Sequence, residues 1–169
     1  MALAAGLGAP VGAETNAVPQ VIRVATPAPP FEMESVAGDT IKLADLTAPA
    51  VIVSFWLRED KPSQRQWPVL SALQTAHGTN QVQVVGVLVE SLARPQLREF
   101  VAREQLHFFV ARYNSETIEG FGGLAAVPTT FVIDRNRNVI QRYVGWVDQA
   151  ALEADVKIIL AAAAARRAE

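Results

Sequence analysis

The chain has 169 residues, of which 50% are hydrophobic and 19% charged, with a net charge of -2. This composition predicts one globular domain, excludes disordered, collagen-like and coiled-coil chains, and offers no basic surface for nucleic acid. Cysteine is absent and His77 and His107 are the only histidines, so disulfides and cysteine nucleophiles are excluded, and neither a metal site nor a cofactor is expected.

The first 27 residues are interpreted as lying outside the domain. Residues 1–13 are uncharged and alanine-rich, and the first basic residue is Arg23. This stretch is therefore either a signal peptide that lacks its basic start or a disordered tail. From residue 14 to residue 30 the composition shifts to proline, alanine, threonine and asparagine, and residues 14–27 are interpreted as a linker. No apolar run approaches the roughly 20 residues of a membrane span, so no transmembrane segment is expected.

The domain is predicted to cover residues 28–169 and to begin with a β-hairpin. Residues 31–36 and 40–43 are the expected strands, and Gly38 and Asp39 lie between them as a turn signal.

A βαβ unit follows the hairpin. Residues 51–55 and 82–89 are continuous β-branched runs, which are typical of strands covered on both faces. Apolar residues at helical spacing and a glycine at the expected stop predict a helix between them. These residues are Trp67, Leu70, Leu73 and Gly78.

The second half of the chain continues the alternation of helices and strands. Its expected elements are a helix at 95–104, a strand at 106–110, a short helix at 116–121, and strands at 129–134 and 139–144. The asparagines of the intervening turn are expected to adopt the left-handed conformation. Asp148 is expected to cap a final helix with an apolar stripe. The order predicts an α/β domain whose mixed central sheet lies between helical layers.

Several segments together carry a resemblance to a known family. They are Pro29-Pro30-Phe31, residues 51–56 with Pro62 and Pro68 downstream, residues 127–134, and Tyr143-Val144-Gly145. In this order and spacing the chain resembles the TlpA/ResA-like thioredoxin-fold (redoxin) family. The resemblance implies the thioredoxin fold with helices on both faces of the sheet, export to the periplasm or another exported location, and a Cys-X-X-Cys pair that exchanges disulfides.

Both cysteines of that pair are replaced in this chain. The corresponding positions read Asp60-Lys61-Pro62-Ser63, preceded by Glu59 where the family usually has tryptophan. Thiol-disulfide exchange needs an attacking thiolate and a resolving thiol, and neither Asp60 nor Ser63 supplies one. Disulfide exchange and peroxide reduction are therefore excluded. The favoured interpretation of Asp60 is a helix cap, and the alternative is recognition of a cationic ligand or partner.

The resemblance also implies a peptide-binding groove. In the family the proline at position 128 is cis, and the backbone of the preceding residue pairs with a bound peptide like an added strand. The candidate groove residues are Trp56, Val127, Pro128, Thr129 and Trp146. The alternative is a turn that defines the fold and has lost its function.

The other aromatic residues and the histidines are expected to be structural. Trp67, Phe108 and Phe109 are assigned to the core, and His77 and His107 are interpreted as structural or solvated.

Two classes of function remain open. The first is a redox-inactive binding or scaffolding module of the cell envelope with a protein or peptide partner. The second is a non-redox enzyme that uses Asp60 or Glu59 as acid or base. An apolar groove beside Pro128 would favour binding, whereas a buried, convergent pair of acids would favour catalysis.

Overall fold

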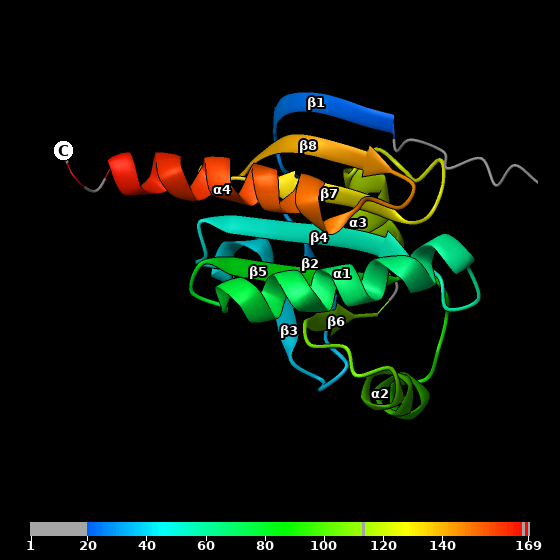
Figure 1. Cartoon of the computed structure of the whole chain (residues 1–169). Helices are drawn as coiled ribbons and strands as arrows, with labels where there is room; N and C mark the ends of the chain where they lie inside the picture. The colour runs from blue at the N-terminus through cyan, green and yellow to red at the C-terminus, as the bar shows by residue number, and fades with distance from the viewer. Residues whose placement is uncertain (1–19, 113, 167, 169) are drawn as a thin grey trace, which may run out of the picture.

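A six-stranded sheet forms the centre of the molecule (Figure 1). The computed structural model describes residues 20–112, 114–166 and 168. The strands lie in the order β1-β8-β7-β4-β5-β6, and β2 and β3 form a separate hairpin. The strands are β1 (Gln20–Pro27), β2 (Glu32–Glu34), β3 (Thr40–Lys42), β4 (Ala50–Trp56), β5 (Val82–Leu88), β6 (Phe109–Ala111), β7 (Thr129–Ile133) and β8 (Asn138–Val144). The α-helices are α1 (Lys61–His77), α2 (Arg94–Arg103), α3 (Ser115–Gly120) and α4 (Gln149–Ala165).

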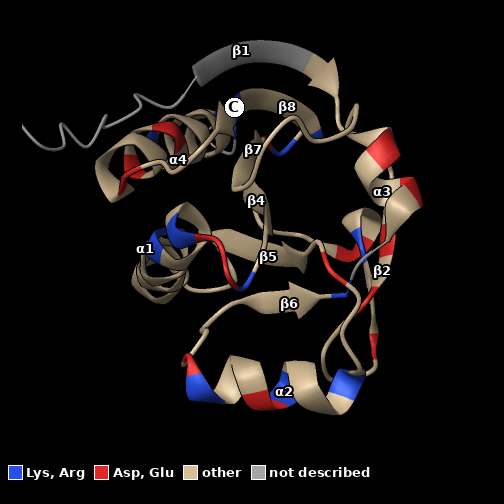
Figure 2. Ribbon diagram, turned by 90° about the vertical axis from the view of Figure 1, so that its right-hand side faces the viewer, with Lys and Arg blue, Asp and Glu red and all other residues tan. Residues whose placement is uncertain are grey.

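Helices cover both faces of this sheet. Helices α1 and α4 lie on one face, and α3 lies with the β2–β3 hairpin on the opposite face (Figures 1 and 2). Strand β4 pairs in parallel with β5 and antiparallel with β7, so the sheet is mixed. The predicted α/β architecture, including the hairpin and the βαβ unit, is confirmed.

The linker interpretation is wrong for residues 20–27. This segment forms β1, which pairs antiparallel with β8 from Gln20 opposite Val144 to Pro27 opposite Asn138. A strand at the edge of a sheet pairs on one side only and tolerates a proline, so it does not need the apolar pattern of a central strand. The rest of the expected linker and the candidate signal peptide lie outside the described residues.

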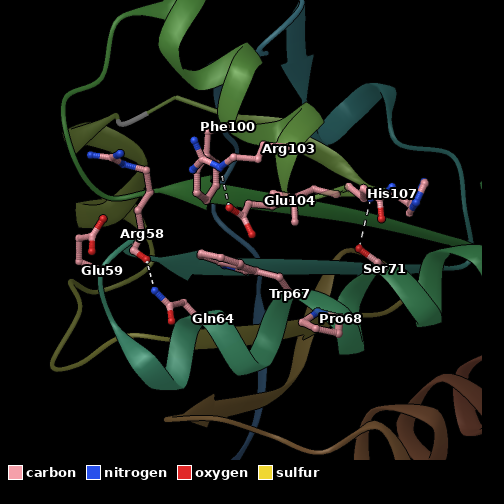
Figure 3. A pocket seen from close by; sticks show the side chains of 12 residues that line it. Arg58, Glu59, Gln64, Trp67, Pro68, Ser71, Phe100, Arg103, Glu104 and His107 are labelled. Carbon is pink, nitrogen blue, oxygen red and sulfur yellow. Dashed lines mark hydrogen bonds and ion pairs between the residues drawn. The ribbon is translucent and has the colours of Figure 1, made fainter.

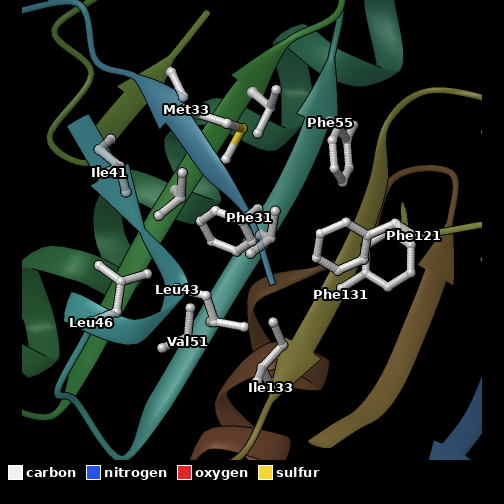
Figure 4. Close-up of a cluster of buried hydrophobic side chains, with 14 of the residues drawn as sticks. Phe31, Met33, Ile41, Leu43, Leu46, Val51, Phe55, Phe121, Phe131 and Ile133 are labelled. Atoms are coloured by element: carbon white, nitrogen blue, oxygen red, sulfur yellow. The ribbon is translucent and has the colours of Figure 1, made fainter. Parts of the chain in front are cut away.

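The largest apolar cluster lies between the sheet and the hairpin. Every residue of β4 is buried, as its continuous apolar run predicted. Phe55 of β4 meets Phe131 of β7 edge to face at 5.9 Å between ring centroids, and Phe121 lies 4.6 Å from Phe131. Phe31 and Met33 close this cluster from the hairpin (Figure 4). The hairpin therefore covers one face of the sheet where a helix would otherwise be needed.

A separate aromatic cluster attaches α2. The rings of Trp56 and Trp67 lie 5.3 Å apart, and Phe100 of α2 lies 5.8 Å and 5.2 Å from them. Gly86 lies against this cluster, and a Cβ atom there would come within 2.5 Å of the Phe108 ring and 2.7 Å of the Trp56 indole nitrogen. Because real Cβ atoms do not approach so closely, only glycine fits this position of β5.

Strand β6 is shorter and later than predicted. Gln105 has a φ of 51°, and the backbone N–H of His107 donates to the Ser71 hydroxyl at 3.2 Å, so these residues form a loop along α1. Leu106, which belongs to this loop, is buried, whereas Phe109 is 39% exposed. The assignment of Phe109 to the core is therefore wrong, and Phe108 is half-buried.

The turn between β7 and β8 also differs from the prediction. Its left-handed residue is Arg137, with a φ of 64°, and not an asparagine. The Arg137 guanidinium donates to the backbone carbonyls of Leu46 and Ala44. These hydrogen bonds to a distant segment stabilise Arg137 in the left-handed conformation, which asparagine and glycine adopt more readily.

Candidate functional site

The first turn of α1 carries the replaced motif. Asp60 is the N-cap, and its Oδ2 accepts the backbone N–H of Ser63 at 2.8 Å. Ser63 is fully buried, and its hydroxyl oxygen accepts the N–H of Leu57 at 3.3 Å. Lys61 and Pro62 are exposed. The predicted capping role of Asp60 is confirmed, and the residue uses a carboxylate oxygen to stabilise the helix start.

Removing this cap is expected to destabilise the fold. Asp60→Ala should lower the free energy of unfolding by about 0.5–2 kcal/mol, whereas Asp60→Asn should cost much less because an amide oxygen also accepts the N–H of Ser63. Denaturant unfolding measures both. Asp148→Ala is the matched control, since Asp148 caps α4 through the N–H of Ala151 at 2.8 Å. Equal stability of the alanine and asparagine variants at position 60 would contradict the prediction.

An ion pair fixes the loop before α1. The Arg58 guanidinium donates from Nε and Nη2 to the two carboxylate oxygens of Glu90, each at 3.0 Å, and the Arg58 backbone N–H donates to the same carboxylate. Partial burial of Glu90 favours its neutral form, but the hydrogen bonds from Arg58 outweigh this effect, so the pKa of Glu90 lies below its ordinary value of 4.5. Glu90 therefore ties the end of β5 to the loop that leads into the site.

This pair should make stability depend on pH in the acid range. A carboxyl group whose pKa is lowered in the folded protein stabilises above its unfolded pKa, and that stability is lost as the pH falls through the lower folded value. The melting temperature is therefore expected to decrease as the pH is lowered below about 4.5. The melting temperature of the Glu90→Gln variant should decrease less steeply with falling pH. At neutral pH its free energy of unfolding should be lower by on the order of 1 kcal/mol. Parallel acid slopes for the two proteins would contradict this account.

The loop before β7 lies at the same end of the sheet. The Val127–Pro128 peptide bond is cis, as the resemblance implied. The Pro128 carbonyl accepts the N–H of Gly145 at 2.8 Å, and the Thr129 hydroxyl donates to the carbonyl of Ala126 at 2.7 Å. Pro128 and Thr129 are buried and Val127 is half-buried. The loop is therefore held by β7 on one side and by the end of β8 on the other.

Gln66 joins α1 to this edge and was not identified from the sequence. Its side-chain amide donates to the carbonyl of Val147 at 3.2 Å, and its oxygen accepts the N–H of Val147 at 2.9 Å. Gln66 is fully buried. The available signal was its place next to Trp67 on the helix face that also carries Leu70, because a polar residue on a buried face needs a partner.

The two tryptophans of the candidate groove differ. Trp56 is fully buried in the aromatic cluster with α2, so it offers no surface to a ligand. Trp146 is half-buried, and the Arg65 guanidinium lies 4.2 Å above its ring. Trp56 is a groove candidate by sequence, but the Phe100 ring of α2 stacks on it. Trp146 remains a candidate.

A cleft of about 600 Å³ lies between α1 and α2 (Figure 3), and neither residue of the cis peptide is among its lining residues. Trp67 and Phe100 contribute its aromatic wall, and Arg58 and Arg103 lie 5.9 Å and 5.4 Å from the Phe100 ring. Arg103 pairs with Glu104, as Arg58 does with Glu90. The positive charges of this cleft are therefore compensated locally.

The titratable residues nearby form no catalytic arrangement. Glu59 is exposed while Asp60 is engaged in the cap, so these acids are not a buried convergent pair. His77 contacts Glu153 at 2.8 Å and joins α1 to α4, and His107 is exposed. Across the described part of the chain, no group of three His, Asp or Glu side chains is placed to hold a metal ion.

Among the helices that the structure describes, none combines the length and the hydropathy that a membrane span requires.

Sequence comparisons connect this chain to thiol-disulfide proteins. The model of the AhpC/TSA family matches residues 24–142. The thiol-disulfide oxidoreductase ResA of Bacillus anthracis is 26% identical over 138 residues, which are 82% of this chain and 79% of that protein. ResA of Geobacillus thermodenitrificans is 26% identical over 139 residues, covering 81% of this chain and 78% of its own.

Solved structures have the same fold. A thioredoxin-family thiol:disulfide interchange protein from Chlorobium tepidum superposes with a TM-score of 0.72 at 28% identity, covering 80% of this chain and 97% of its own. A secreted thiol-disulfide isomerase from Corynebacterium glutamicum gives a TM-score of 0.73 at 21% identity. The match covers 86% of this chain and 95% of the isomerase chain. These matches confirm the thioredoxin-like fold expected from the sequence.

Proposed function

Since this chain belongs to the AhpC/TSA family but contains no cysteine, we propose that it is a redox-inactive binding module for an extended segment of a protein or peptide partner. The observation that carries the proposal is the Asp60 carboxylate, which caps α1 where the family resemblance implies the first cysteine. The start of the helix is stabilised there without a thiol.

The edge around the cis peptide supports binding by strand addition. Val127 is half-buried, and its neighbour Ala126 is exposed. Hydrogen bonds from Gly145 and Thr129 fix the loop, so a bound segment meets an ordered backbone. Main-chain pairing gives affinity in this mode, and flanking side chains give selectivity. The site residues of the proposal are therefore Val127, Pro128, Thr129 and Trp146.

The enzyme alternative has less support. General acid–base catalysis needs a carboxyl group within reach of the substrate and a second group to complete the proton transfer. Asp60 already accepts the N–H of Ser63, and Glu59 is exposed at the edge of the α1–α2 cleft. We therefore favour binding over catalysis.

The protein is expected to show no disulfide reductase or peroxidase activity. The sequence has no thiol to attack a disulfide or a peroxide, so insulin reduction should equal the buffer background at every protein concentration. A turbidity assay with dithiothreitol measures this, and a cysteine-containing thioredoxin is the positive control. Turnover that increases with the concentration of this protein would exclude the redox-inactive assignment.

Binding is tested with a thiol-free extended ligand. The probe is insulin B chain with its cysteines reduced and carbamidomethylated, and the readout is the backbone amide shifts of Val127, Thr129 and Gly145. Ala126→Gln should weaken binding by roughly tenfold, because it places a longer side chain beside the pairing backbone. Ala161→Gln on the exposed face of α4 is the matched control. The proposal fails when none of these amides shifts.

We place this module outside the cytoplasm, in the periplasm or another exported location. The Corynebacterium glutamicum structure of the same fold is described as a secreted isomerase. Cell fractionation with N-terminal sequencing tests this placement, and a mature chain that begins near Glu14 is expected. An intact Met1 in the cytosolic fraction would contradict it.

A further inference from the structure

We infer that Arg65 recognises a carboxylate side chain of the bound segment, which makes the preferred partner acidic beside the paired backbone. This inference rests on the proposed function, since it concerns a ligand held at the cis peptide. It assigns a selective role to a residue outside the positions of the replaced motif.

Arg65 is placed at this edge by its own stacking on Trp146 and by the hydrogen bonds of the next residue, Gln66. Its guanidinium lies 4.2 Å above the Trp146 ring, and the adjacent Gln66 binds both backbone groups of Val147. Gly145, which precedes Trp146, donates to the carbonyl of Pro128 at 2.8 Å. The Arg65–Trp146 stack therefore lies where α1 meets the loop that supports the cis peptide.

The guanidinium of Arg65 has its charge available for an external acid. Arg65 is exposed, and within residues 20–112, 114–166 and 168 no carboxylate forms an ion pair with it. Stacking on an indole occupies the face of the guanidinium and leaves its N–H groups at the rim, which is the geometry that binds a carboxylate through two hydrogen bonds. The stack also restricts the side chain before a ligand arrives.

The neighbouring charges favour the same type of ligand. Lys61 lies one helical turn before Arg65, and its ammonium group contacts the neutral Gln64 side chain at 3.4 Å. Of the nearby acids, Asp60 and Asp148 accept backbone N–H groups at helix starts, where the helix dipole offsets part of their charge, and Glu59 is exposed at the edge of the α1–α2 cleft. Figure 2 shows the acidic stretch before α1 giving way to basic residues along the first turns of the helix.

The test uses short peptides of alternating valine and threonine that carry Asp, Asn or Lys at one central position. Wild-type protein is expected to bind the Asp peptide roughly two- to fivefold more tightly than the Asn peptide, as an exposed ion pair allows. Arg65→Gln should abolish this preference, so that the variant binds the Asp and Asn peptides with equal affinity. Arg98→Gln, at an exposed arginine of α2, is the matched control. The preference should also shrink at high salt.

Two results separate the inference from its premise. Equal affinity of the wild type for the Asp and Asn peptides, or a preference that survives in Arg65→Gln, would overturn the role of Arg65 and leave the binding module intact. An absence of shifts at Val127 and Gly145 with every peptide would overturn both.

Discussion

Introducing the double substitution D60C/S63C is expected to convert this chain into a dithiol protein that oxidises to an intramolecular disulfide. The two positions lie three residues apart at the start of α1, and the N–H of Ser63 already meets the Asp60 side chain at 2.8 Å. Cα atoms at this helical spacing lie within the range that a disulfide bridges. A thiol at the helix N-terminus should have a lowered pKa because unpaired N–H groups stabilise the thiolate.

The measurement is thiol titration of the folded double variant before and after mild oxidation, together with insulin reduction. D60C alone should give one reactive thiol, because Asp60 is half-buried, and S63C alone a protected one, because Ser63 is fully buried. A double variant that keeps its fold and stays reduced under oxidation would show that these positions are not equivalent to the family's cysteine pair.

Replacing Gln66 by leucine is expected to lower the free energy of unfolding by about 2–4 kcal/mol. Leucine is similar in size, so the loss arises from the buried N–H and carbonyl of Val147, which would lose their partners. Denaturant unfolding monitored by circular dichroism measures this. Gln96→Leu on the exposed surface of α2 is the control and should change stability by less than about 0.5 kcal/mol.

A second variant separates hydrogen bonding from side-chain size. Gln66→Glu keeps the shape, but an ionised carboxylate cannot donate to the carbonyl of Val147. Burial would raise the pKa of the new acid, so this variant should gain stability relative to the wild type as the pH falls and the acid becomes protonated. An unchanged difference between the two proteins from pH 7 to pH 5 would refute the role assigned to this amide.

The parts of the fold that local sequence determines were predictable. The N-cap at Asp60, the end of α1 at Gly78 and the buried run of β4 all follow from short-range signals, and the structure has each of them. The replaced redox motif was equally visible, since it needs only the identity of two residues at a recognised position.

The features that depend on distant segments were not predictable in this way. Gln66 reaches Val147 because α1 packs beside the loop after β8, and Trp56 is buried between α1 and α2 by the rings of Trp67 and Phe100. Strand β1 pairs along the edge of β8, and its β-branched residues Val21, Ile22 and Val24 are a short-range strand signal that the linker interpretation overlooked. Local β-propensity is therefore a poor predictor of structure where a segment distant in sequence supplies the stabilising contacts.

The carboxylate that caps α1 also determines how many covalent forms this edge can adopt. A cysteine pair has an oxidised and a reduced form, whose ratio follows the redox potential of the surroundings. With Asp60 and Ser63 in place the edge has a single form. The partner proposed to dock beside Pro128 would therefore meet the same surface under oxidising and reducing conditions, and its binding would depend on its concentration and not on the redox potential.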